Sequence, residues 1–214
     1  MTSVSLKKKL KAISNQMPET HSIRLHRAIS WLKGAEDQEM IPDLRLICLW
    51  ISINSLYAVD NLRATEIQER ARFGSFVDKL VECDEGHRLY SILWHKFSGP
   101  VKMLIENQYV YAPFWDFQRG QARSWENSFQ QSIVDANNAL SDRNVKYLLR
   151  IVLDRLYVLR NQLIHGGATY KSKVNRAQVR DGGNLLGVLL PIIIELMMIS
   201  WQEDWGQIYF PVIK

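Results

Sequence analysis

The 214-residue sequence predicts an all-α fold. In its longest periodic segments, apolar residues recur three and four positions apart, which is the spacing of one face of an α-helix. No segment between turn signals alternates apolar and polar residues with a period of two, so no β-sheet is expected. Hydrophobic residues make up 47% of the chain, which is enough to form a core for one domain.

Two helices are predicted in the N-terminal part of the chain. Between residues 21 and 33, Leu25, Ile29 and Leu32 recur at helical spacing, and Gly34 follows as the expected end of that helix. Pro42 suits the first turn of a second helix, where its missing amide hydrogen costs nothing. Apolar residues cover two faces of this second helix, so we expect it to lie centrally in the domain.

Residues 62–140 are less regular and are predicted to form a helical insertion within a single domain that spans residues 1–214. Helices are expected around residues 65–82 and 85–97. The aromatic segment that follows, residues 109–115, could stack on RNA bases. Buried packing, or a role as a lid, is the more frequent use of such a segment.

The clearest helix is expected to begin after a cap at Ser141 and to end at Gly166, since glycine readily takes the left-handed conformation that closes helices. Its apolar face comprises Val145, Leu148, Leu149, Val152, Leu156, Leu159 and Leu163. A polar loop to Gly183 is predicted next, with residues 181–184 forming a turn. Residues 185–201 then form a final buried helix, because they fall short of the ~20 apolar residues that span a membrane comfortably.

Composition excludes several classes of function. The excess of 27 Lys and Arg over 22 Asp and Glu gives a net charge of +5, which permits phosphate-rich partners without requiring them. Cys48 and Cys83 show no disulfide spacing, and an interrupted apolar stretch follows the basic N-terminus, so a cytoplasmic location is expected. The histidines lack metal-ligand spacing and no nucleotide-binding glycine loop is present, so neither a metal nor a cofactor is expected.

Three polar residues cluster near the end of the helix that begins after Ser141. Asn161 and His165 lie four positions apart and are therefore neighbours on the face opposite the leucines. Arg160 lies at the border of the two faces, where an arginine can lay its stem on apolar surface and project its guanidinium group. We expect these three groups to converge.

This pattern, an Arg followed by a polar residue and by a His five positions after the Arg, resembles the signature of the HEPN superfamily. Residues 26–32, 49–57 and 160–198 also resemble the Apea-like group of bacterial HEPN proteins, whereas residues 62–140 resemble no family. The resemblance implies a HEPN-type helical bundle that dimerises. It further implies a metal-independent endoribonuclease of a toxin–antitoxin or antiphage system, with RNA as substrate and an antitoxin or nucleotidyltransferase-type protein as a possible partner.

In that interpretation Arg160, Asn161 and His165 are catalytic, because a histidine transfers protons near neutral pH and an arginine binds phosphate oxygens. Further substrate-binding candidates are Lys171, Lys173, Arg176, Arg180 and Asn54. The basic side chains could hold the RNA backbone or form an ordinary solvated face. Asn54 lies in a largely apolar helix, so its amide either bonds within the core or faces the motif.

Two other hypotheses remain open at this stage. A HEPN module without catalytic activity could bind RNA, a nucleotide or a partner protein. A membrane-associated protein could use residues 185–201, although Gly187, Pro191 and Glu195 interrupt that segment.

Overall fold

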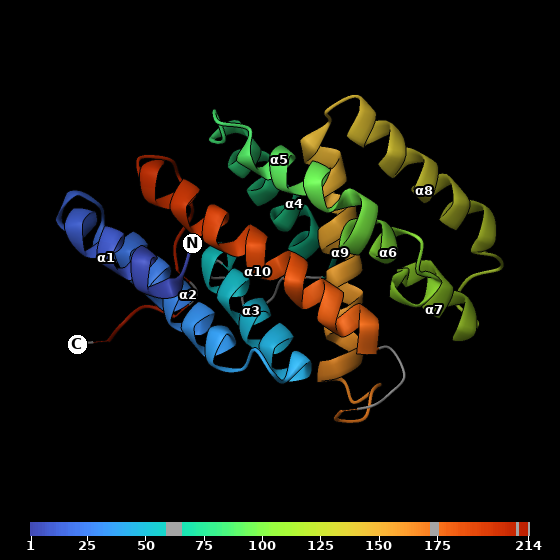
Figure 1. Cartoon of the computed structure of the whole chain (residues 1–214). Helices are drawn as coiled ribbons and strands as arrows, with labels where there is room; N and C mark the ends of the chain where they lie inside the picture. Colours follow the sequence, from blue (N-terminus) through green and yellow to red (C-terminus); the bar gives the residue numbers. More distant parts are fainter. Residues whose placement is uncertain (59–65, 172–175, 209, 214) are drawn as a thin grey trace. The chain divides into compact units, whose positions relative to one another are not determined.

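The computed structural model describes residues 1–58, 66–171, 176–208 and 210–213, and of residues 66–70 it describes the backbone alone. Within these residues the regular elements are α-helices, short 3₁₀-helices and one π-helical segment, and none is a β-strand (Figure 1). The predicted all-α fold is confirmed.

The chain forms two compact units. Unit 1 comprises Met1–Gly86 and Leu186–Lys214, and unit 2 comprises His87–Leu185. The insertion predicted over residues 62–140 does not coincide with either unit, because its first part belongs to unit 1 and the remainder to unit 2. Unit 2 also contains the helix that carries the Arg–His motif.

Unit 1 is built from four N-terminal helices and the end of the last helix, and α2 packs along α1 and α3 (Figure 1). Its elements are α1 (Ser3–Ile13), η1 (Ser14–Gln16), α2 (Glu19–Asp37), α3 (Pro42–Tyr57), α4 (Glu66–Glu82) and the latter part of α10 (Arg176–Ile199). Pro42 begins α3, as predicted. Of the two apolar faces of α3, one is buried and includes Leu46, Leu49 and Ile53.

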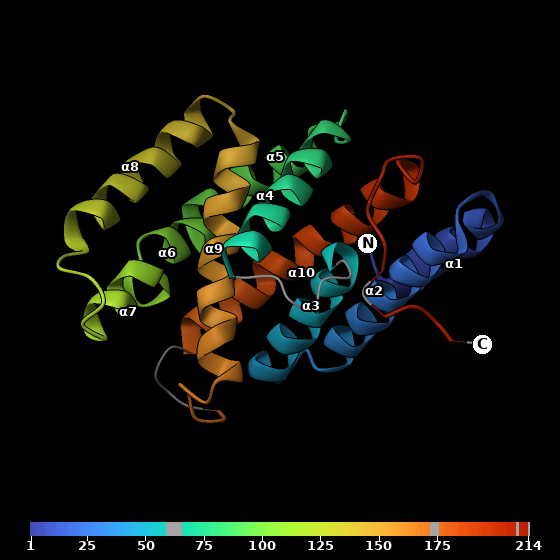
Figure 2. The same cartoon turned by 180° about the vertical axis from the view of Figure 1, so that it is seen from behind.

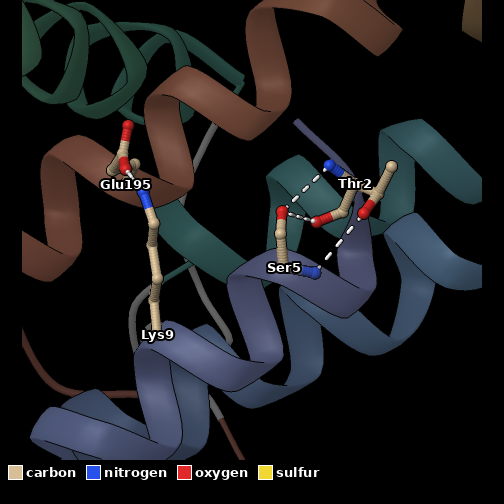
Figure 3. A network of polar contacts seen from close by, with 4 residues as sticks. All are labelled: Thr2, Ser5, Lys9 and Glu195. Carbon is tan, nitrogen blue, oxygen red and sulfur yellow. Dashed lines mark hydrogen bonds and ion pairs between the residues drawn. The ribbon is translucent and has the colours of Figure 1, made fainter.

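Polar contacts hold α1 at its N-terminus and at Lys9. Thr2 Oγ1 accepts a hydrogen bond from the Ser5 backbone N–H at 3.4 Å, and Ser5 Oγ accepts one from the Thr2 N–H at 3.1 Å (Figure 3). This reciprocal pair satisfies two amides that the first turn of a helix leaves without partners. Further along α1, Lys9 forms an ion pair with Glu195 of α10 (Figure 3).

Two buried basic side chains of α2 bind backbone carbonyls near the C-terminal end of unit 1. His21 Nε2 donates to the Met197 carbonyl at 2.9 Å, and Arg24 donates to the carbonyls of Trp205 and Gly206. Burial lowers the pKa of His21, and it lowers the pKa of Arg24 to about 10. Both side chains therefore bind the C-terminal part of unit 1, and burying them disfavours their charged forms.

The predicted helix end at Gly34 is wrong, because α2 continues to Asp37. Gly34 lies in the helix interior, where a Cβ atom would be 3.7 Å from Cys48 Sγ of α3. Burial raises the pKa of the half-buried Cys48 thiol. This glycine sits at a helix–helix contact and does not end the helix.

Unit 2 contains short elements followed by two long helices. They are α5 (Arg88–Lys96), η2 (Phe97–Val101), α6 (Lys102–Ile105), η3 (Gln108–Val110), α7 (Ala112–Gln118), α8 (Glu126–Ser141), α9 (Val145–Ile164) and the beginning of α10. A short connection joins α8 to α9, and the two helices pack against each other (Figure 2). The leucine face predicted for α9 is largely buried, with Leu148, Val152 and Leu156 fully enclosed.

The predicted cap at Ser141 is wrong, because Ser141 is the last residue of α8. The chain reverses through Arg143, which is left-handed with a φ of 55°. Asn144 caps α9 instead, and its Oδ1 accepts a hydrogen bond from the Tyr147 N–H at 3.2 Å. An asparagine is as good a cap as a serine.

The predicted loop and turn before the last helix are also wrong, because α10 begins at Arg176 and includes residues 181–184. A Cβ atom on Gly182 would lie 2.9 Å from a methyl carbon of both Leu156 and Leu159 of α9. The absence of a side chain at Gly182 therefore allows α10 to approach α9 closely.

By length and composition, α10 could cross a membrane. In the structure most of its apolar side chains are enclosed by protein, as expected for a core helix. The buried residues include Leu185, Leu186, Leu189, Leu190, Ile193, Ile194, Leu196, Met197 and Met198.

Candidate functional site

The Arg–His motif occupies the C-terminal turn of α9 in unit 2. Ile164 is the last helical residue, and the backbone N–H of His165 still donates to the Asn161 carbonyl at 3.0 Å. Gly166 follows with a φ of 73°, the left-handed conformation predicted from the sequence. The motif therefore ends where the helix exposes its last carbonyl groups.

Arg160 and Asn161 are brought together, as predicted. Arg160 Nη1 donates to Asn161 Oδ1 at 2.8 Å, and the guanidinium carbon lies 5.8 Å from the centre of the Tyr157 ring. Arg160 is half-buried, and its Nε is enclosed without a hydrogen-bond partner in the described part of the chain. The stem thus lies on protein surface, and the guanidinium group is oriented by Asn161.

His165 is exposed at the same helix end. Its imidazole makes no hydrogen bond or ion pair with any residue that the structure describes, Arg160 included. The three motif residues therefore share one helix turn, but among the described side-chain contacts only Arg160 and Asn161 bond to each other. An imidazole left accessible in this way can exchange protons with a bound ligand.

Tyr109 lies at the motif, a contact that the sequence does not indicate. Gln162 Nε2 donates to the Tyr109 carbonyl, which also accepts a hydrogen bond from Trp115 Nε1 at 2.8 Å. Gln162 precedes His165 by three positions and so neighbours it on the helix. The Tyr109 backbone is thereby held against the last turn of α9, and its ring is 45% exposed.

The rest of the aromatic segment forms a packed cluster. Phe114 is buried, with ring centres 5.5 Å from Tyr109 and 5.1 Å from Trp125, both edge-to-face. This geometry supports the packing interpretation for Phe114. Tyr109 and Trp125 are more exposed to solvent than Phe114.

Arg155 is a buried charged residue that was not predicted from the sequence. Its guanidinium carbon lies 4.2 Å from the centre of the Tyr111 ring, and its Nη2 donates to Ser132 Oγ at 2.7 Å. Burial lowers the pKa of Arg155 to about 10. Its position three residues after Val152 and four before Leu159 was the available signal, because this spacing puts it on the apolar face.

The predicted basic loop is partly helical. Lys171 is left-handed, with its ammonium nitrogen 5.3 Å from the centre of the Tyr170 ring, and Lys173 lies outside the described residues. Arg176 and Arg180 belong to the first turns of α10. Arg180 is largely exposed, and its Nε lies 3.5 Å from Asp181 Oδ1, as expected for a solvated face.

Asn54 lies on α3 in unit 1, whereas the motif belongs to unit 2. Its Oδ1 is buried and accepts no hydrogen bond from the residues that the structure describes. If Asn54 were a core amide with internal hydrogen bonds, this oxygen should accept one, and among the described residues it does not. A role for Asn54 beside the motif stays a prediction.

The residues described here contain no group of three or more His, Cys, Asp or Glu side chains that could hold a metal ion. Comparisons of the chain with protein-family models, with curated proteins and with solved structures find no match. The HEPN interpretation therefore depends on the motif residues and the resembling stretches alone.

Proposed function

We propose that this chain is a HEPN-type endoribonuclease that cleaves RNA without a metal ion, through Arg160, Asn161 and His165. One observation carries the proposal: a guanidinium group oriented by Asn161 shares an exposed helix end with an accessible imidazole. Phosphate binding and proton transfer are the two capacities that cleavage of an RNA backbone requires.

The reaction is attack of a ribose 2′-oxygen on the adjacent phosphorus. A base removes the 2′-hydroxyl proton, the bond from phosphorus to the 5′-oxygen breaks, and an acid returns a proton to that oxygen. The products are a 2′,3′-cyclic phosphate and a 5′-hydroxyl end. His165 serves as the proton-transfer group, and Arg160 stabilises the charge that gathers on the phosphate oxygens.

Each motif supplies one histidine, whereas the reaction uses an acid and a base. We therefore place two motifs face to face across a two-fold axis, so that the partner subunit's copy supplies the second group. Tyr109 bonds to Gln162 through its backbone carbonyl, and its exposed ring offers a surface on which a neighbouring base can stack. The proposal places the enzyme in the cytoplasm, in a toxin–antitoxin or antiphage system.

The test is cleavage of a labelled RNA by the purified protein in the presence of EDTA. We expect His165→Ala and Arg160→Ala each to lower the rate by roughly 10²-fold or more, and Asn161→Ala to lower it less. Arg150→Ala is the control, because Arg150 is an exposed arginine of the same helix that lies about 15 Å along it from the half-buried Arg160. Thermal melts of all variants separate lost chemistry from lost structure.

A substrate with a 2′-deoxyribose at the cleaved position should remain intact, because it lacks the attacking oxygen. Equal cleavage by wild type and His165→Ala would assign the activity to a contaminant. In that case the chain would be better described as a HEPN module that binds RNA or a partner without cleaving it.

A further inference from the structure

An open pocket with a volume of 460 Å³ lies on unit 1, between α1 and α2. The surface that it exposes to solvent is mainly apolar, and Leu10, Ile23 and Val212 are among its lining residues. All three belong to unit 1, so the pocket is formed within one compact unit. An open apolar surface of this kind is typical of a site where another polypeptide packs.

Cations surround this pocket. Lys7 and Lys11 lie one turn apart on α1, and Arg27 lies on α2. None of the three side chains makes a hydrogen bond or ion pair with the residues that the structure describes. Lys9, by contrast, is neutralised by Glu195 of α10 (Figure 3). The pocket therefore fits an apolar side chain that has an acidic neighbour.

The chain carries such a pair of residues in the connection between α2 and α3. Met40 is 91% exposed there, and Glu39 before it is also exposed. The Glu39 carboxylate has no hydrogen-bond or ion-pair partner among the described residues. Met40 lies 13 positions after Arg27, or roughly 20 Å along the helix direction, so it does not fill the pocket of its own chain. The pocket and the Glu39–Met40 pair can therefore meet only between two copies.

Trp31 lies on α2 between these two features and is 42% exposed. It follows Ile23 and Arg27 at intervals of four, which puts the three residues along one face of α2. Trp31 is eight positions after Ile23 and nine before Met40, and is therefore close to the midpoint. When two copies pack with antiparallel α2 helices around a two-fold axis at Trp31, each Met40 reaches the pocket of the other copy.

We propose that this face of unit 1 binds a second copy of the chain, with the two α2 helices antiparallel across a two-fold axis at Trp31. Met40 fills the partner subunit's pocket, because its unbranched side chain adapts to an irregular apolar surface. Glu39 neutralises the cations at the rim of that pocket, and the two Trp31 rings exclude water at the centre. A dimer has one two-fold axis, so the same axis also relates the two Arg160–His165 motifs. The contact itself does not rest on the proposed RNA cleavage.

The first experiment is analytical ultracentrifugation of the full chain over a dilution series, in which we expect a dimer. Met40→Ala removes the side chain that fills the pocket, and Trp31→Ala removes the central ring. Each should weaken self-association by about tenfold or more. Both residues are exposed in the single chain, so thermal melts below the dissociation concentration should match the wild-type melt.

Charge reversal tests whether Glu39 of one copy meets Arg27 of the other. Glu39→Arg and Arg27→Glu should each weaken self-association by about tenfold or more, since each change brings like charges together. A mixture of the two variants should associate within about threefold of wild type, because both contacts of the mixed dimer again join an arginine to a glutamate. Glu203→Arg is the matched control, the same change at an exposed glutamate of unit 1 outside the contact, and it should leave association within about twofold.

A wild-type chain that stays monomeric at every concentration would overturn the proposal. A dimer that none of these variants weakens would also overturn it, and the copies would then associate through another surface, such as the facing motifs. A mixture of the charge variants that stays as weak as either variant alone would show that the two residues do not meet. Flotation of wild type with vesicles of phosphatidylcholine and phosphatidylglycerol, without self-association, would assign this face to a membrane instead.

Discussion

Arg155 shows how a single side chain changes the energetics of unit 2. It lies on the apolar face of α9, and its charge is buried against Tyr111 and Phe129 at 4.2 and 5.6 Å from the ring centres. Ser132 accepts one of its hydrogen bonds, whereas its Nε has no partner among the described residues. The stem therefore contributes packing, and the charge contributes a desolvation cost that the rings offset in part.

Replacing Arg155 should separate these two contributions. Arg155→Met keeps most of the stem and removes the buried charge, so we expect a free energy of unfolding within about 1 kcal/mol of wild type. Arg155→Ala removes the stem as well and should cost about 2–4 kcal/mol. Urea unfolding at neutral pH measures both values. Equal losses in the two variants would mean that the cation itself stabilises unit 2.

His21 predicts an acid sensitivity of unit 1. Burial, and the charge of Arg24 to a smaller extent, lower the pKa of His21 in the folded protein below 6.5, against the raising effect of its bond to Met197. As the pH falls below about 6.5 the unfolded chain therefore takes up this proton first, so the free energy of unfolding declines. Above about pH 6.5 this contribution to stability is fully present.

The measurement is urea unfolding between about pH 7.5 and about pH 5. In His21→Gln an amide N–H replaces the imidazole donor to Met197 and does not titrate, so the decline should be smaller than in wild type. His26→Gln, a change at an exposed histidine of the same helix, should leave the wild-type decline intact. An identical pH dependence in His21→Gln and wild type would exclude His21 as the source.

At the scale of helices, periodicity predicted which segments are helical but not where several of them begin and end. Gly34 and Gly182 suggested a helix end and a turn, because in sequence a glycine is most often a break in regular structure. Both lie inside helices, at contacts with a neighbouring helix. A single sequence does not contain the identity of that neighbour, so this use of glycine could not be predicted.

The two glycines should respond in opposite ways to alanine. Gly34→Ala adds a Cβ at an ordinary contact distance from Cys48 and improves helix propensity, so we expect a gain of about 0.5–1 kcal/mol. Gly182→Ala places a Cβ 2.9 Å from Leu156 and Leu159, and the overpacking should cost about 1–3 kcal/mol. Thermal melts measure both changes.

A second substitution tests the cause assigned to Gly182. Leu156→Val shortens one of the two side chains that the new Cβ meets, so in the Gly182→Ala background it should recover part of the lost stability. Wild-type stability of Gly182→Ala alone would show that both leucines move aside at no cost.

The candidate site was predictable only in part, because a single sequence does not show which distant segments pack together. Arg160, Asn161 and His165 could be placed at one helix end because their spacing is local. The contact between Gln162 and Tyr109 joins residues 53 positions apart, and no local pattern indicates it. Likewise, the spacing of Lys7 and Lys11 is visible in the sequence, but the pocket that they form with α2 depends on how the two helices pack.

At the scale of the whole molecule, the proposed reaction requires that two chains assemble into a dimer. Each chain brings one His165, whereas simultaneous acid and base catalysis uses two proton-transfer groups. Light scattering should therefore find a dimer at the concentration at which RNA is cleaved. A monomer that cleaves RNA would contradict the two-motif site while leaving the chemistry of the single motif open to test.

Mixing subunits tests the shared site directly. When wild-type protein exchanges subunits with His165→Ala protein, only dimers with two wild-type motifs are complete, so activity should fall as the square of the wild-type fraction. At equal mixing it should therefore fall to about one quarter, whereas independent sites would leave about one half. Mixing with Arg150→Ala controls for exchange itself and should leave the activity unchanged. A linear loss with His165→Ala, after exchange has been verified, would show that each motif acts alone and that the second histidine is not required.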